Sequence, residues 1–174
     1  MELKMYHGSM NANIDMFYPF SHFGSKFAAT EAAFRRVHFN EVGTPTLYKV
    51  SIRLPDEATI EIPDWTSPRP RNLALALSKH FADERSVTFA GLAKNISISE
   101  ASDKSMRPAL FERISQVLLP TVKGIYYKNR HEGEANEISL CLACVQCVSS
   151  SEIVDFAPND VEKVKAILKE KHPR

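Results

Sequence analysis

The chain has 174 residues, 44% hydrophobic and 25% charged, a balance typical of one globular domain with a sizeable core. Its formal net charge of +1 argues against a general electrostatic attraction to nucleic acid or an anionic membrane, although Arg35-Arg36 and Arg69-Pro70-Arg71 could each form a local basic patch. The first residues lack the apolar core of a signal peptide, and no stretch approaches the roughly 20 apolar residues of a membrane-spanning helix.

The three cysteines lie close together, at positions 141, 144 and 147. An odd, clustered set is a poor disulfide framework and favours a reducing compartment. We therefore expect a protein that acts in a cytoplasm, its own or that of a cell into which it is delivered. A shared metal is disfavoured, because no fourth cysteine exists and Cys141 and Cys144 would point to opposite faces of a strand. Buried free thiols are the expectation.

In the first half of the chain, apolar spacing predicts a strand over 3–6, an Ala-rich helix over 27–34, and strands over 47–54 and 58–62. The Ala-rich helix would bury Phe27, Phe34 and the alanines between them. The strand over 47–54 alternates apolar and polar side chains, which indicates that one of its faces is buried.

In the second half, the pattern predicts helices over 72–81 and 104–119, strands over 124–128 and 138–148, and an amphipathic helix over 159–171. Asn159 or Asp160 would cap that last helix. Residues 83–102 are polar and Ser-rich around Gly91, which predicts an irregular segment. Mixed elements without a βαβ rhythm predict an α+β fold of mostly antiparallel strands, in a single domain over 1–174.

The first motif that suggests chemistry is Tyr6-His7-Gly8-Ser9, at the end of the first predicted strand. A glycine there lets a ligand approach the main chain closely, because no Cβ stands in the way, while His7 and Ser9 add an imidazole and a hydroxyl. The alternative is a surface turn with an incidental histidine.

At all four positions this motif resembles the aromatic-His-Gly-Ser/Thr turn of ADP-ribosyltransferases of the diphtheria-toxin and poly-ADP-ribose-polymerase type. The resemblance implies that His7 hydrogen-bonds the adenosine ribose of NAD and that the Gly8 backbone binds the nicotinamide amide.

The second motif, His22-Phe23-Gly24-Ser25, opens the Ala-rich helix. It resembles the His-Phe-Gly-Ser/Thr segment of ADP-ribosyltransferase domains in bacterial polymorphic toxins and phage proteins. The polymerase-type enzymes carry Tyr-Phe here, before a helix whose aromatic residue stacks on nicotinamide. Because His22 replaces the first tyrosine, the stacking ring is left between Phe23 and Phe34. Ordinary core packing is the alternative for both rings.

The third motif concerns carboxylates. Breaking the bond between nicotinamide and ribose develops positive charge on the sugar, and a carboxylate that hydrogen-bonds a ribose hydroxyl stabilises that charge. The candidates are Glu132, Glu134 and Glu137. The chemistry needs one of them, and a second could activate the acceptor. The alternative is an acidic loop that is merely solvated.

The family motifs divide between these carboxylates. Residues 124–133, Gly-Ile-Tyr-Tyr-Lys-Asn-Arg-His-Glu-Gly, resemble the Gly-Ile-x-Tyr-x-Asn-x-x-Glu-Gly stretch of the toxin and phage group, which selects Glu132. Asn136-Glu137-Ile138 resembles the start of the last catalytic strand of the polymerases, which selects Glu137. Glu132 and Glu134 also form the Glu-x-Glu pair of arginine-specific relatives, but those carry arginine in place of His7. We favour Glu132 narrowly over Glu137.

The chain thus resembles a small single-domain ADP-ribosyltransferase of the toxin, effector and phage group. The resemblance implies a split β-sandwich of two mainly antiparallel sheets with flanking helices, and NAD as the substrate bound between them. ADP-ribose would pass to a protein, a nucleic acid or a small molecule, with release of nicotinamide, and an inhibitor or antitoxin protein is a candidate partner. The alternatives are an NAD glycohydrolase with water as acceptor and a catalytically inactive binding module on the same fold.

Overall fold

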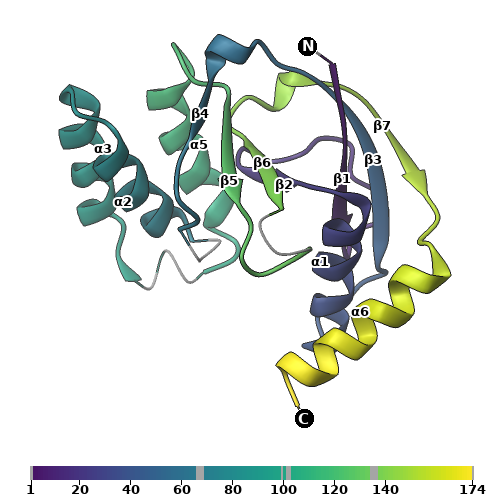
Figure 1. The fold of residues 1–174 in the computed structure, drawn as a ribbon. Helices are drawn as coiled ribbons and strands as arrows, with labels where there is room; N and C mark the ends of the chain where they lie inside the picture. The colour runs from purple at the N-terminus through teal and green to yellow at the C-terminus, as the bar shows by residue number, and fades with distance from the viewer. Residues whose placement is uncertain (1, 66–68, 99, 101–102, 134–136, 174) are drawn as a thin grey trace.

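The computed structural model describes residues 2–65, 69–98, 100, 103–133 and 137–173. Two β-sheets form its centre (Figure 1). Sheet one has the order β1-β3-β7 and sheet two the order β2-β6-β5-β4; the strand pairs are antiparallel except β4 with β5. The strands are β1 (Glu2–Ser9), β2 (Ser21–Phe23), β3 (Thr46–Arg53), β4 (Thr59–Glu61), β5 (Gly124–Lys128), β6 (Ile138–Leu142) and β7 (Val148–Val154).

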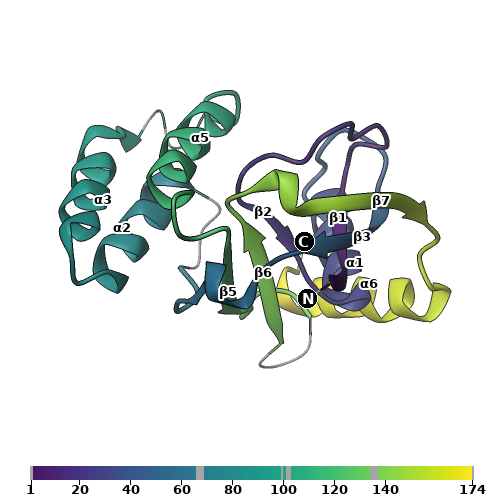
Figure 2. The ribbon, with the colours of Figure 1, turned by 90° about the horizontal axis from the view of Figure 1, so that it is seen from above.

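Helices cover the sheets from two sides. α2 (Pro70–His80), α3 (Glu84–Asn95) and α5 (Arg107–Leu118) gather beside sheet two, whereas α1 (Lys26–His38) and α6 (Pro158–Lys171) lie at the other end of the molecule, beside sheet one (Figures 1 and 2). The mixed α+β architecture with two mainly antiparallel sheets is confirmed. No helix in the described ranges is long and apolar enough to cross a membrane.

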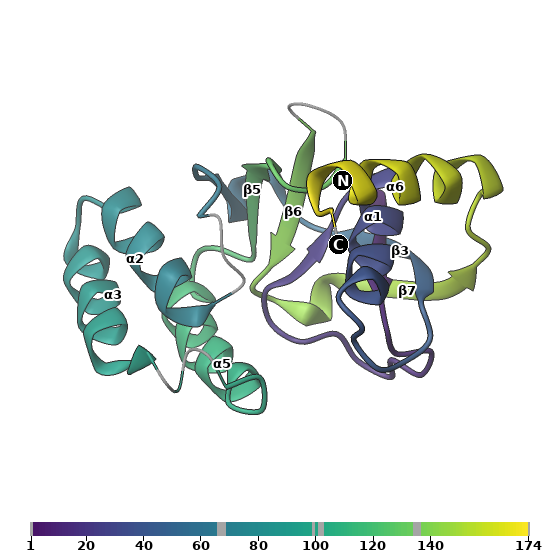
Figure 3. The ribbon, with the colours of Figure 1, turned by 90° about the horizontal axis from the view of Figure 1, so that it is seen from below.

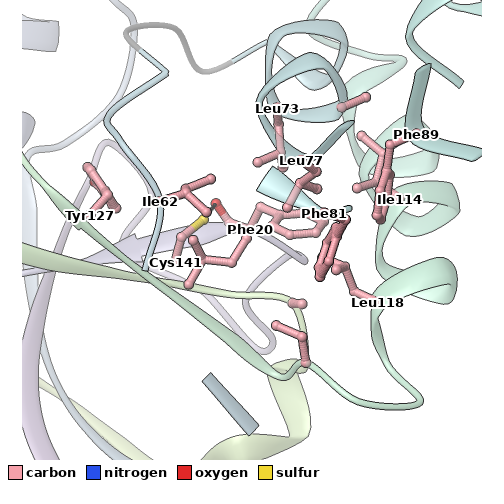
Figure 4. Close-up of a cluster of buried hydrophobic side chains, with 14 of the residues drawn as sticks. Phe20, Ile62, Leu73, Leu77, Phe81, Phe89, Ile114, Leu118, Tyr127 and Cys141 are labelled. Atoms are coloured by element: carbon pink, nitrogen blue, oxygen red, sulfur yellow. Dashed lines mark hydrogen bonds between the residues drawn. The ribbon is translucent and has the colours of Figure 1, made fainter. Parts of the chain in front are cut away.

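Sheet two is buried on both faces. Successive residues of β6 point to opposite sides, so Leu140 and Leu142 join the cluster between the sheets and Cys141 joins the cluster beneath the helices. The cluster between the sheets consists of Phe17, Phe23, Tyr48, Val50, Ile52, Leu54, Leu140, Leu142 and Cys147. In the second cluster, Leu73, Leu77, Phe89 and Ile114 come from the helices, and Tyr127 lies at the margin far from them (Figure 4).

The two sheets meet through their backbones at one isolated bridge. The Tyr6 N–H donates to the Gly24 carbonyl at 2.9 Å, and the Gly24 N–H donates to the Tyr6 carbonyl at 3.0 Å. This bridge brings the end of β1 next to the end of β2. The two N-terminal motifs, predicted separately from the sequence, are therefore neighbours in space.

Helix α1 packs directly on β1 at Gly8. A Cβ at this position would overlap the carbonyl oxygen of Ala29 and lie 3.0 Å from the Ala33 nitrogen. The small side chains predicted for the helix explain this close approach, since Ala28, Ala29 and Ala33 are buried. Ser25 caps the helix, its Oγ accepting the Ala28 N–H at 3.1 Å.

The predicted irregular segment over 83–102 is wrong in its first part, because α3 occupies Glu84–Asn95. Asp83 caps this helix by accepting the Arg85 N–H at 2.9 Å. Phe89 and Ala93, four residues apart, supply its buried side. Two buried residues in a polar segment were too few to indicate a helix, since the serines and Gly91 favoured an irregular segment.

The predicted single strand over 138–148 is also wrong. β6 ends at Leu142, a 3₁₀ turn spans Val145–Cys147, and β7 (Val148–Val154) then pairs with β3 in the other sheet. Residues 138–148 form one apolar run because the chain crosses here from one sheet to the other, and its side chains enter both hydrophobic clusters. The largely exposed β7, with three serines in a row, gave no apolar signal of a strand.

The predicted cap of the last helix is a smaller error. α6 begins at Pro158 after Ala157 and has no side-chain cap. Proline suits the first turn because it lacks the N–H that would go unsatisfied there. Asn159 and Asp160 consequently lie inside the first turn.

Candidate functional site

An aromatic and imidazole cluster lies on the helix-facing side of sheet two. His22 stands opposite Cys141 in the pairing of β2 with β6. The Tyr127 hydroxyl lies 2.6 Å from His22 Nδ1. The Trp65 ring lies 5.8 Å from the His22 ring and 5.0 Å from the Tyr127 ring, between centroids. Trp65 follows β4, and no local pattern in the sequence identified it as a site residue.

The His22 imidazole and the Tyr127 phenol are both uncharged near neutral pH. Burial lowers the pKa of His22 to about 4, with smaller contributions from His7 and the Arg36 charge outweighing that of Asp64. Burial also raises the pKa of Tyr127 well above its usual value, and Cys141 and Glu132 act in the same direction. The cluster therefore forms a neutral surface around the partly buried indole ring of Trp65, with the His22–Tyr127 hydrogen bond next to it.

Asn129 builds the turn that presents Glu132. Its Oδ1 accepts the backbone N–H groups of His131 and Glu132, each at 3.0 Å. Its Nδ2 donates to Ser139 Oγ at 3.2 Å and approaches Glu132 Oε2 at 3.5 Å. Asn129 is buried, so these bonds satisfy a side chain that burial alone would penalise. The Asn-x-x-Glu spacing of the sequence motif thus has a local physical cause.

The Glu132 carboxylate lies where α1 meets this turn. Its Oε1 is 3.7 Å from Arg35 Nη1. Burial raises the pKa of Glu132, while Arg35 and the Asn129 amide oppose the rise. A larger share of Glu132 is consequently protonated at a given pH than for an ordinary exposed glutamate. Sequence reasoning treated Arg35 as part of a basic patch and did not foresee this pairing.

Glu137 comes just before β6 in the chain, and its carboxylate lies at the N-terminal end of α1. Its Oε1 accepts the Ser25 N–H at 2.8 Å, and the helix dipole favours a carboxylate there. Gly133 lies against its other oxygen, because a Cβ at Gly133 would overlap Oε2. Gly133 also has a φ of +85°, which favours glycine. Glu132 and Glu137 therefore belong to one cluster, whereas Glu134 lies outside the described residues.

The turn predicted at His7-Gly8-Ser9 is wrong, because these residues belong to β1 and pair with β3, and they contribute less directly to this cluster. The His7 ring packs against Phe17 and Phe23, at centroid distances of 5.2 and 5.6 Å, and its Nδ1 donates to the His22 carbonyl at 2.8 Å. Gly8 is covered by α1. Ser9 is buried, and its Oγ accepts the Asn11 N–H at 3.0 Å. In this structure the end of β1 holds β2 and α1 in place.

The two phenylalanines predicted as stacking rings both have packing contacts. Phe23 is 1% exposed in the cluster between the sheets. Phe34 packs edge-on against Phe156 at 5.1 Å between centroids, where α1 meets the segment before α6. These contacts favour the core-packing interpretation that the sequence left open. Trp65 and Tyr127 are the rings that lie beside His22.

The three cysteines are free thiols, with Cys141 and Cys147 buried and Cys144 partly buried. Burial is the main cause that raises the pKa of Cys147 to about 11, with Cys144 adding to it. The described residues contain no group of three or more histidine, cysteine, aspartate or glutamate side chains that could hold a metal ion.

The two largely buried imidazoles, His7 and His22, predict a loss of stability in mild acid. Burial lowers the pKa of His7 and of His22 to about 4, against 6.5 in the unfolded chain. Between these values the unfolded state binds more protons, so the free energy of unfolding falls as pH decreases from 6.5 to 4, by at most about 3 kcal/mol for each imidazole. Urea unfolding across this range would measure the loss.

His7→Gln and His22→Gln should each remove about half of that pH dependence, whereas His80→Gln, at an exposed position on α2, should leave it unchanged. A wild-type stability that stays flat from pH 6.5 to 5 would contradict the burial of these imidazoles in neutral form.

Comparison with known proteins adds no relative to this arrangement. No protein-family model, no curated protein and no solved structure matches the chain.

Proposed function

We propose that the protein cleaves NAD, releases nicotinamide and transfers ADP-ribose to an acceptor. The observation that carries the proposal is the convergence of the second and third motifs on one site, next to the first motif at the Tyr6–Gly24 bridge. His22 contacts Tyr127, which is 105 residues away in the chain, and Ser25 contacts Glu137, 112 residues away. The pairing of Arg35 with Glu132 adds a third contact between the same two segments.

The chemistry of the site suits glycosidic cleavage. The bond between the ribose carbon and the nicotinamide nitrogen breaks, the electron pair leaves with nicotinamide, and the sugar becomes positively charged. Glu132 stabilises that charge as a carboxylate, and Arg35 favours its ionised form. The acceptor's nucleophile then bonds to the same carbon, and its proton is lost to solvent.

The neutral surface next to the carboxylates suits the nicotinamide ring. Trp65, which is only partly buried, offers a flat face for stacking, and the His22 imidazole, whose Nδ1 is held by the Tyr127 hydroxyl, lies beside it. Two mainly antiparallel sheets joined at the Tyr6–Gly24 bridge support the split-sandwich fold that the sequence resemblance implies. The proposed nicotinamide surface, however, lies on the helix-facing side of sheet two, because an apolar cluster fills the space between the sheets where the resemblance implies NAD. The resemblance to toxin and phage domains is the ground for proposing an effector role.

Nicotinamide release tests this proposal. Purified protein is incubated with NAD labelled in its ADP-ribose part, with and without a cell lysate, beside the double variant Glu132→Gln/Glu137→Gln. We expect release by the wild type only, with label transferred to a lysate component. Free labelled ADP-ribose without transferred label would instead identify an NAD glycohydrolase.

Binding is measured separately through Trp65, the only tryptophan of the chain. Its ring lies within the proposed nicotinamide surface, so NAD should change its fluorescence, and Trp65→Phe provides the matched silent control. Binding without release would favour an inactive binding module. Absence of both binding and release would refute the proposed function.

A further inference from the structure

Glu31 is a buried carboxylate whose two bonds both leave its own helix. It lies in the middle of α1 and is 1% exposed. Its Oε2 accepts the Gly133 N–H at 2.9 Å, and its Oε1 accepts from Lys171 Nζ at 3.0 Å. A buried carboxylate is costly unless it is paired and hydrogen-bonded, and here both partners come from distant parts of the chain. Glu31 thus joins three segments: α1, the turn that presents Glu132, and α6.

We propose that Glu31 is a positioning residue for the candidate site: it fastens the 129–133 turn to α1, and Lys171 of α6 holds Glu31 in that role. The fastening is a property of the fold alone, whereas its effect on catalysis rests on the proposed function. The two parts have separate measurements.

The turn needs support at both of its ends. At its start Asn129 binds the backbone N–H groups of His131 and Glu132. At its end the Gly133 N–H has Glu31 as its acceptor. The Glu132 side chain projects between these two supports, toward Arg35. Loss of the Glu31 bond would leave the turn fixed at one end, and the carboxylate would lose a defined position.

Helix α6 places Lys171 beside Glu31 on the solvent side of α1. It crosses α1 (Figure 3), and its buried side chains Val164 and Leu168 lie on the inner face. Lys171 follows Leu168 by three residues, which returns it to the same face. Its side chain is 46% exposed, so the ammonium reaches Glu31 from solvent. The end of α6 is therefore coupled to Gly133 through one buried carboxylate.

Amide hydrogen exchange of the full chain tests the fastening. The variants are Lys171→Met, which keeps an apolar stem but removes the charge, and Glu31→Leu, which removes both acceptor oxygens. Lys169→Met, on an exposed position of the same last turn, is the matched control. We expect exchange at Gly133 to rise at least tenfold in Lys171→Met and Glu31→Leu, and to stay at the wild-type rate in Lys169→Met. Lys171→Arg should restore protection.

The rate of trypsin cleavage is a second measure of the mobility of the same turn, because Arg130 is exposed within it. Cleavage after Arg130 should accelerate at least fivefold in Lys171→Met and not in Lys169→Met. Unchanged exchange and unchanged cleavage in Lys171→Met and Glu31→Leu would overturn the fastening.

The positioning role is tested by the kinetics of nicotinamide release. Lys171→Met should lower kcat about tenfold while KM changes less than twofold, and Lys171→Arg should recover kcat. Faster exchange at Gly133 with an unchanged kcat would overturn the positioning role. If the wild type releases no nicotinamide, the proposed function fails, while the exchange and trypsin results still decide whether Glu31 fastens the turn.

Discussion

Replacing Gly8 by alanine should destabilise the protein by about 3 kcal/mol or more, or prevent folding. The added Cβ would overlap the Ala29 carbonyl oxygen and crowd the Ala33 nitrogen, both backbone atoms of α1. Backbone atoms cannot move aside by a rotamer change, so the whole helix would have to shift from β1. Urea unfolding followed by circular dichroism measures the change in the free energy of unfolding.

Gly91→Ala is the matched control for this substitution. Gly91 lies in α3, and a Cβ there meets no atom within 4 Å. Alanine is favoured over glycine inside a helix, so this variant should be more stable by about 0.5–1 kcal/mol. Native stability in Gly8→Ala would show that α1 does not pack on β1 as closely as described.

The second large effect concerns the two carboxylates. Glu132→Gln should lower the rate of nicotinamide release about 10³-fold, because the isosteric amide keeps the shape of the site but cannot balance positive charge on the ribose. Glu137→Gln should lower it by tenfold at most, since an amide oxygen can still accept the Ser25 N–H. Both variants are assayed for kcat and KM with NAD, with Glu112→Gln, exposed on α5, as the control.

The pH profile gives an independent check on Glu132. Its ionised form is the one that stabilises the transition state, and its pKa is raised by burial. The wild-type rate should therefore fall with decreasing pH at a higher pH than an ordinary glutamate would cause, and Glu132→Gln should lose this dependence. An equal loss of rate in Glu137→Gln would instead assign the transition-state role to Glu137.

The sequence predicted the helices and strands that bury one continuous face, because their apolar residues recur at the spacing of that element. The strand over 47–54 was predicted because its alternate residues are buried, and the helices over 72–81 and 104–119 because each has a continuous apolar stripe. β7 was missed because it is exposed along most of its length. The boundary at Leu142 was missed because an apolar run shows where side chains are buried but not where a chain changes sheets.

The candidate site was predictable where short motifs encode local geometry. Asn129 and Gly133 shape the turn that carries Glu132, so their spacing is visible in the sequence. Trp65 and Glu31 were not predictable, because each joins the site by a contact between distant segments. Gly8 was predicted to be a place where a ligand approaches the main chain, but the group that approaches it here is α1.

The way the chain divides itself between the two sheets has a kinetic consequence. It passes from sheet one to sheet two and back twice over, so neither sheet can form from one continuous stretch. In sheet one the central strand, β3, pairs with β1, which precedes it in the chain, and with β7, which follows it by about a hundred residues. Closing loops of that length costs entropy before any contact repays it. Refolding should therefore be slow for a domain of this size, with the helices formed early and the meeting of β3 and β7 among the last steps.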